Sequence, residues 1–257
     1  MIGTGIGLGL SGYRLKTGPS TIPESIGGLQ LWLDGSDLTT LYQSSGGSLA
    51  NSDGDPLGYW IDKSGNGKHA TQLSGTNKPS VRLNVKNGLS VVRMDGVSSR
   101  LIESTLSLNA PYSIFCVAKR SGGDATGRLF HLGASQDQFL YLGTLGSDGY
   151  AWFNGNGTTW NSVANTTPSR TWGSGFHFFG GTNSSGTAVP YWDTYTQDSI
   201  NGTTAQSTGY AFGYLPTLSS IQRFGGDICE FLIYGKLLAS SEIGKLSGYL
   251  NDKWGVY

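Results

Sequence analysis

The sequence predicts an all-β protein, an antiparallel sandwich of two sheets with one short helix at its C-terminus. Three observations carry this prediction. Short stretches of alternating apolar and polar residues follow one another, clusters of Gly, Asn, Asp and Ser separate them, and a helical period occurs only near the end. The 257 residues suffice for one large sandwich, and nothing in the sequence requires a second domain.

Composition narrows the classes of partner. Glycine contributes 41 of the 257 residues, more than twice its usual share of roughly 7 %, and only 13 % of the chain is charged. The 17 basic and 17 acidic residues cancel, so nucleic acid is not an expected partner. The longest apolar stretch, residues 1–10, is far shorter than the ~20 residues that cross a bilayer. We therefore expect no membrane insertion, and no signal peptide because no basic residue precedes this stretch.

The chain divides into residues 1–25, an extended N-terminal arm that anchors the protein in an assembly, and residues 26–257, the sandwich. Residues 1–22 are rich in glycine and lack any sustained period of 2 or 3.6. Such an arm has no core of its own and can lie on another subunit. A poorly ordered tail explains the same composition.

The first predicted strand covers residues 29–34, with Leu29, Leu31 and Leu33 on one face and Gln30, Trp32 and Asp34 on the other. Further strands are expected at Ser90–Met94, Tyr112–Lys119, Arg128–Gly133, Gln138–Gly143, Gly149–Phe153, Gly175–Thr182, Val189–Tyr195, Ala211–Tyr214 and Asp227–Tyr234. Ten or more short strands joined by turns are typical of a sandwich.

The helix is expected after Ser240 or Ser241 as N-cap, and Gly255 can end it. Its apolar face consists of Ile243, Leu246, Leu250 and Trp254. Two glycines inside the helix cost it roughly 1 kcal/mol each relative to alanine. Packing on the sandwich must therefore hold it in place.

For two sequence features, the preferred interpretation is a structural role and not a functional one. Cys116 and Cys229 lie in predicted strands and are interpreted as small buried apolar residues, with a disulfide between neighbouring strands as the alternative. Asn66 and Gly67 favour a tight turn, and the Asp62 carboxylate can accept backbone N–H bonds from the same loop.

Four segments in this order, Leu31–Asp37, Trp60–Ala70, Val92–Gly96 and Gly226–Tyr234, together with the closing helix, resemble the concanavalin A-like, laminin G-like jelly-roll modules. These modules occur in many bacteriophage structural proteins and secreted bacterial proteins, and the resemblance covers about residues 28 to 256. It implies two curved antiparallel sheets, with the first strand, around Leu31, beside the last, around Phe231. Family members bind glycans or proteins, serve as structural modules or accompany glycan-cleaving enzymes, so fold carries over better than function.

Some relatives bind calcium near loops of this type. An EF-hand starting at Asn51 is excluded, because Pro56 stands where the sharp turn needs glycine. A looser calcium site would use Asp62 and Asn66 with loop carbonyls, together with Asp227. The alternative is that these side chains only cap turns. We expect no required cofactor, with calcium as the ion to test.

Catalytic patterns are missing from the sequence. The retaining sandwich hydrolases that this fold resembles carry an E-x-D-x-x-E strand, which is not found here, and we place Glu230 on a solvated strand face. His69, His131 and His177 lie far apart in sequence and without metal-ligand spacing. A non-enzymatic protein is therefore expected.

Between Gly122 and Pro216 the composition shifts to Gly, Ser, Thr and Asn with interspersed aromatics, which indicates long loops at one end of the sandwich. Aromatic rings beside amides and carboxylates are what a sugar-binding surface needs, although rings on alternating strand positions more often fill a core. The candidate glycan-binding residues are Tyr150, Trp152, Trp160, Trp172, Tyr191, Trp192 and Asp193.

These observations predict a virion surface module: a fibre, spike, decoration or tail accessory protein. The arm would attach it to other virion proteins, and the sandwich would bind host-surface glycan. We expect a homo-oligomer, as is usual in such settings. A purely architectural role is the first alternative and a polysaccharide-degrading enzyme the second; a secreted or cell-surface protein is the alternative location.

Overall fold

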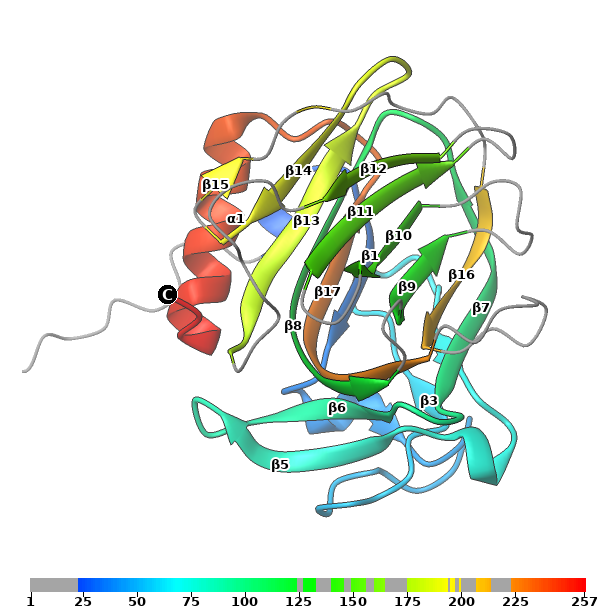
Figure 1. The fold of residues 1–257 in the computed structure, drawn as a ribbon. Coiled ribbons are helices and arrows are strands. Elements are labelled where there is room, and N and C mark those ends of the chain that lie inside the picture. Colours follow the sequence, from blue (N-terminus) through cyan, green and yellow to red (C-terminus); the bar gives the residue numbers. More distant parts are fainter. Residues whose placement is uncertain are drawn as a thin grey trace, which may run out of the picture.

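The computed structural model describes residues 23–123, 127–132, 140–145, 149–155, 160–164, 175–193, 195–196, 199, 207–213 and 223–257. These residues form two antiparallel sheets packed face to face, with a helix on the outer face of one of them (Figure 1). The predicted all-β sandwich with one C-terminal helix is therefore confirmed. Residues 1–22 of the predicted arm lie outside the described residues, whereas Pro23–Ser25 form a single helical turn, and the Pro23 carbonyl accepts a hydrogen bond from the Tyr234 hydroxyl.

Sheet A has eight described strands, in the spatial order β15, β14, β13, β8, β17, β6 and β5, with β1 also pairing to β17. Their bounds are β1 (Leu29–Asp34), β5 (Ser80–Lys86), β6 (Leu89–Asp95), β8 (Tyr112–Gly123), β13 (His177–Asn183), β14 (Ala188–Trp192), β15 (Tyr195–Thr196) and β17 (Phe224–Tyr234). The long β17 pairs with β6 through its first half and with β1 through its second half.

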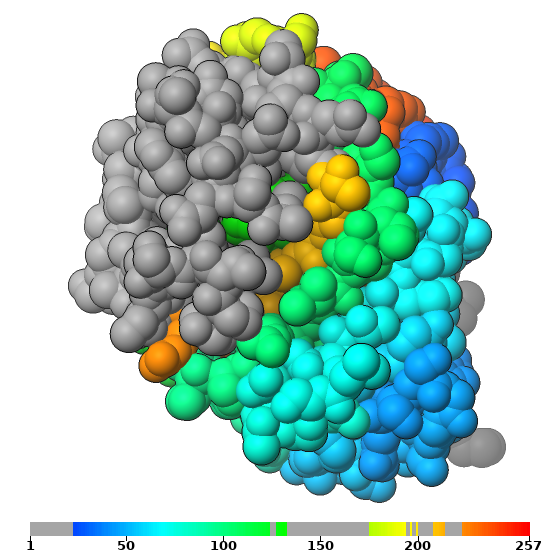
Figure 2. Space-filling model, turned by 90° about the vertical axis from the view of Figure 1, so that its right-hand side faces the viewer, coloured from blue at the N-terminus to red at the C-terminus, as the bar shows by residue number. Residues whose placement is uncertain are grey.

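Sheet B has nine described strands, in the order β12, β11, β10, β9, β16, β7, β4, β3 and β2. Their bounds are β2 (Leu41–Tyr42), β3 (Tyr59–Trp60), β4 (Ala70–Thr71), β7 (Arg100–Leu108), β9 (Arg128–Leu132), β10 (Leu140–Leu145), β11 (Gly149–Gly155), β12 (Trp160–Ala164) and β16 (Ser207–Gly213). Figure 2 shows the face on which β7 (green) and β16 (gold) lie beside the early part of the chain (blue and cyan).

Short single-turn helices interrupt the strands at η1 (Pro23–Ser25), η2 (Leu38–Thr40) and η3 (Gly75–Asn77). The sequence analysis missed β5, β7, β12 and the two-residue strands β2, β3 and β4. It also predicted one strand over Val189–Tyr195, whereas the structure breaks it at Asp193, which has a left-handed backbone with φ of 49°. Part of the region expected to form loops is regular, because β10, β11 and β12 form an antiparallel ladder.

The first and last strands of the sandwich pair as the resemblance implied. Leu31 lies opposite Ile233, and Leu33 lies opposite Phe231. Both leucines are fully buried between the sheets. A register shift at Gln30 places Leu29 opposite Tyr234 instead, on the outer face. The prediction that Leu29 shares a face with Leu31 is therefore wrong, because a bulge breaks the alternation.

A second bulge lies in the middle of β17. Ile228 pairs with Ala118 and Glu230 pairs with Val117, so Cys229 is the extra residue. As a result, Cys229 and Glu230 both face outward, whereas Ile228 and Phe231 face the core between the sheets. This single inserted position directs a carboxylate toward the helix.

The two cysteines are free and buried, which confirms their interpretation as small apolar residues. Cys116 belongs to the cluster between the sheets, and Cys229 belongs to the cluster beneath the helix. They therefore lie on opposite faces of sheet A. Burial raises the pKa of each thiol.

The helix α1 (Ser240–Trp254) packs on the outer face of sheet A (Figure 1). Its buried residues are Ile243, Leu246, Tyr249, Leu250 and Trp254, which include the whole predicted apolar face. Its N-cap is Ala239 and not a serine; the Glu242 side chain accepts a hydrogen bond from the Ala239 N–H at 2.9 Å. Gly255 ends the helix with φ of 59°, a left-handed conformation that glycine adopts without strain. No helix among the described residues is long and apolar enough to cross a membrane.

Candidate functional site

The aromatic pair predicted to bind glycan lies on β14, and the strand separates its two members. Trp192 faces the core, is 1 % exposed, and has its ring 5.9 Å from that of Phe179. Tyr191 faces the outer side, is partly exposed, and has its ring 5.9 Å from that of Phe115. Burial raises the pKa of Tyr191. Strand alternation explains the difference, since neighbouring side chains point to opposite faces. Of this pair, only Tyr191 is partly exposed.

Asp193 closes the β13–β14 ladder. Its backbone N–H donates to the Phe178 carbonyl at 2.6 Å, and its Oδ1 accepts from the Phe178 N–H at 3.1 Å. Its Oδ2 lies 3.0 Å from Nδ1 of His177. The carboxylate thus holds the strand end and orients the imidazole.

The other four glycan candidates are only partly placed. The backbone of Tyr150 and Trp152 belongs to β11, and Trp160 is the first residue of β12. In the register, Trp152 lies opposite Leu142 on one side and Val163 on the other. Their side chains, and Trp172 altogether, lie outside the described residues. Their role in glycan binding stays a prediction.

The loop that carries Asp62 is held by that carboxylate, as the structural interpretation expected. Oδ1 accepts from the backbone N–H groups of Trp32 and Ser64, at 3.0 and 2.9 Å. Oδ2 accepts from the Ser64 hydroxyl and the Lys68 N–H, at 2.8 and 3.0 Å. Asn66 fastens the tip of the loop to β1, because its amide donates to the carbonyls of residues 29 and 30.

These contacts do not favour calcium at the predicted ligands. Each oxygen of Asp62 already accepts two hydrogen bonds, so a cation would have to displace fixed donors. Asp227 is bound bidentately by Arg93, at 2.6 and 2.9 Å. Asp227 lies five residues along β17 from Leu232, and Leu232 pairs with Trp32, which donates a hydrogen bond to Asp62. Five strand residues span roughly 16 Å, so Asp227 is far from the Asp62 loop. The described residues contain no group of three or more His, Cys, Asp or Glu suited to a metal ion.

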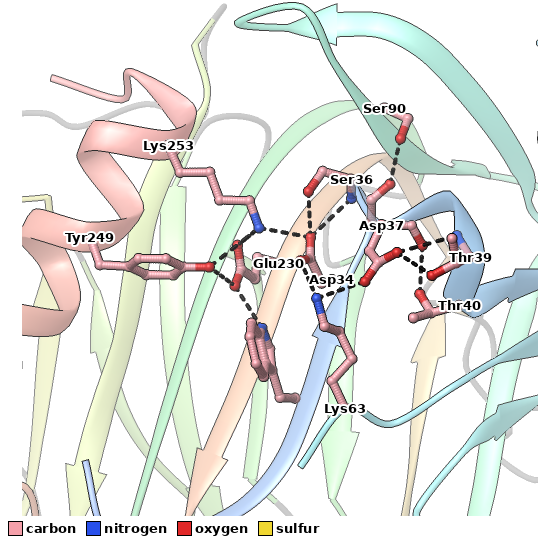
Figure 3. Close-up of polar contacts among 12 residues, drawn as sticks. Asp34, Ser36, Asp37, Thr39, Thr40, Lys63, Ser90, Glu230, Tyr249 and Lys253 are labelled. Atoms are coloured by element: carbon pink, nitrogen blue, oxygen red, sulfur yellow. Dashed lines mark hydrogen bonds and ion pairs between the residues drawn. The ribbon is translucent and has the colours of Figure 1, made fainter. Parts of the chain in front are cut away.

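A buried cluster of charges lies where α1 meets sheet A (Figure 3). Glu230 is fully buried and its two oxygens accept four hydrogen bonds. Oε1 accepts from the Trp32 indole and the Tyr249 hydroxyl, at 2.7 and 3.0 Å. Oε2 accepts from Lys253 and the Trp254 indole, at 2.7 and 2.8 Å. The prediction of a solvated strand face for Glu230 is wrong, because the helix covers that face.

Asp34 extends this cluster toward the Asp62 loop. Lys253 contacts Oδ1 of Asp34 at 2.8 Å, and Lys63 contacts Oδ2 at 2.9 Å. Lys63 also pairs with Asp37 at 2.9 Å. Burial pushes the pKa of Asp34 upward, but the two lysines outweigh it and hold that pKa below its ordinary value. Burial, followed by repulsion from Asp34, raises the pKa of Glu230.

The cluster links four segments and offers no free carboxylate oxygen to a substrate. All four donors to Glu230 come from β1 and α1. Lys63 connects the loop after β3 to the cluster through its ion pair with Asp34. Sequence reasoning placed Trp32 and Asp34 together on the polar face of the first strand but gave no signal for the lysines. We assign the cluster the role of attaching α1 to the sandwich.

The fold has relatives among solved structures, whereas no family model matches the sequence and no characterised protein matches it in sequence. A Trypanosoma rangeli sialidase in complex with sialic acid superposes with a TM-score of 0.58 at 13 % identity, covering 88 % of this chain and 33 % of that one. Botulinum neurotoxin type C, whose cell entry depends on interaction with two ganglioside molecules, gives 0.57 at 16 %, covering 87 % and 51 %. The receptor-binding domain of botulinum neurotoxin type G gives 0.55 at 15 %, covering 85 % and 50 %.

At these identities the likeness shows the fold alone, an antiparallel β-sandwich. The chain spans about one third to one half of the length of these proteins. None of the three is a bacteriophage protein, so the phage setting stays a prediction.

Proposed function

We propose that this protein is a lectin-like module that binds a host-surface glycan without cleaving it. The observation that carries the proposal is the sandwich fold. A sialidase in complex with sialic acid and a neurotoxin whose cell entry depends on two ganglioside molecules have a similar fold. Tyr191 supports it, because a partly exposed ring on a sheet face can pack against the apolar side of a sugar. The buried Glu230 cluster supports binding over cleavage, since its carboxylates are engaged by fixed donors.

Glycan binding is tested with the full chain on an array of host polysaccharides and oligosaccharides. We expect binding to at least one glycan, weakened about tenfold or more by Tyr191→Ala, Trp152→Ala or Trp160→Ala, because each removes a stacking ring. Tyr257→Ala is the matched control, since Tyr257 is an exposed tyrosine beyond α1. Binding to no glycan at millimolar concentration would favour the architectural role, and release of shorter fragments would show an enzyme.

We propose further that the module belongs to a virion surface, where it forms a homo-oligomer and residues 1–22 attach it to other virion proteins. The low charge and the glycine-rich N-terminal segment support this setting, with a secreted or cell-surface protein as the alternative. Deletion of residues 1–22 should leave the sandwich folded and abolish its incorporation into the particle. A truncated protein that still joins its assembly at full occupancy would contradict the anchoring role.

A further inference from the structure

A partly exposed aromatic ring lies beside two lysines on the outer face of sheet A. The ring is that of Phe176, one residue before β13, and it packs at the margin of the cluster beneath α1. Lys86 Nζ lies 5.5 Å from the ring centroid and Lys119 Nζ lies 5.7 Å from it. Both distances are within the range of a cation–π contact. We call these three residues the Phe176 surface.

Three separate segments converge to form the Phe176 surface. Lys86 ends β5 at a hairpin whose turn, Asn87 and Gly88, has φ values of 52° and 75°, as a tight turn of this type requires. The Asn87 amide donates to the Lys253 carbonyl at 2.7 Å, which fastens the hairpin to the last turn of α1. In Figure 1 the tip of this hairpin, the end of α1 and the start of β13 gather at one side.

The position of Lys119 follows from the pairing of β13 with β8. His177 lies opposite Ala118, so the next step of the register brings Phe176 opposite Lys119. Tyr191 lies on the same outer face but opposite Gly180, four residues further along β13, roughly 13 Å away. The stacked and buried rings of Phe115 and Phe178 lie between Phe176 and Tyr191. The Phe176 surface is therefore distinct from the Tyr191 candidate.

The two lysines carry charge that neighbouring carboxylates do not neutralise. Asp227 lies opposite Lys119 in the register, but both of its oxygens are bound by Arg93. Asp53 pairs with Arg82 of β5 at 3.0 Å. Among the described residues, no carboxylate lies within ion-pair distance of Lys86 or Lys119. In a chain of zero net charge, this is a local concentration of positive charge.

We propose that the Phe176 surface binds a carboxylate-bearing sugar of an acidic glycan. The two ammonium groups bind the carboxylate through charge-assisted hydrogen bonds, and the ring packs against carbon atoms of the sugar. This inference rests on the proposed glycan-binding function and names the class of glycan. It adds a site that the aromatic candidates of the sequence do not include.

The test measures binding of sialyllactose and of lactose to the full chain by titration calorimetry, because the two ligands differ only in the acidic sugar. We expect the wild-type protein to bind sialyllactose and to bind lactose at least tenfold more weakly. Lys86→Ala and Lys119→Ala should each weaken sialyllactose binding about tenfold, the effect of one lost charge-assisted contact. Lys245→Ala is the matched control, because Lys245 is an exposed lysine of α1 that does not belong to the Phe176 surface. Lys86→Arg should retain binding, since it keeps the charge.

Unchanged sialyllactose binding in both alanine variants would overturn this inference and leave the lectin function standing. The same holds if lactose binds as tightly as sialyllactose. A wild-type protein that binds no glycan on the array would instead remove the proposed function itself. Circular dichroism spectra of the variants should match that of the wild type, since neither lysine takes part in an ion pair of the described residues.

Discussion

Glu230→Ala is expected to lower the free energy of unfolding by about 3–5 kcal/mol. The substitution removes the acceptor of two indole N–H groups, one hydroxyl and one ammonium, all at the junction of β1, β17 and α1. Unpaired buried donors each carry a desolvation cost, and the lost side chain leaves a cavity in addition. Because α1 contains two glycines and depends on packing, its attachment should weaken first.

Equilibrium unfolding in urea measures this effect, with the fluorescence of Trp32 and Trp254 as reporters beside the substituted site. Glu24→Ala is the matched control, because Glu24 is exposed in η1 and should change stability by no more than about 0.5 kcal/mol. Glu230→Gln keeps the shape of the side chain but places an amide donor among donors, so it should also destabilise. A loss below about 1 kcal/mol for Glu230→Ala would mean that apolar packing alone holds the helix.

Phe231→Ala is expected to cost a similar amount, about 3–5 kcal/mol, for a different reason. The Phe231 ring projects from sheet A and lies 4.3 Å from the ring of Phe130 and 4.9 Å from that of Phe212, both in sheet B. The side chain is fully buried. Truncation therefore removes an apolar contact between the two sheets and leaves a cavity between them.

Thermal or urea unfolding of three variants separates this effect from general sensitivity. Phe231→Leu fills much of the same volume and should cost about 1.5 kcal/mol. Val97→Ala, at a position 62 % exposed, should stay within about 0.5 kcal/mol of the wild type. Equal losses for Phe231→Ala and Val97→Ala would contradict the packing of β17 against β9 and β16.

Much of the fold was predictable where local patterns are strong. The helix was found from four apolar residues at helical spacing and a terminal glycine, and both its buried face and its end agree with the structure. The turn at Asn66 and Gly67, with Asp62 as acceptor, was also predictable, because the residues that define it lie within a few positions of one another. The pairing of the strands around Leu31 and Phe231 followed from the family resemblance, not from the residues alone.

The candidate site was less predictable, and strand alternation explains part of the failure. Tyr191 and Trp192 were proposed together, although neighbours on a strand face opposite ways and only Tyr191 reaches the outer surface. Bulges at Gln30 and Cys229 then reversed the expected face of Leu29 and directed Glu230 toward α1. A bulge depends on the partner strand, so no pattern within β17 alone could reveal it.

The sequence by itself determined the class of fold, the C-terminal helix and the tight turns, because these follow from side-chain periodicity and backbone preferences over a few residues. Only the tertiary structure decided which charged, polar and aromatic groups meet. Glu230 and Trp32 lie 198 positions apart, and Lys86, Lys119 and Phe176 come from three separate segments of the chain. Such neighbours are set by the register and packing of distant segments, which local sequence does not encode.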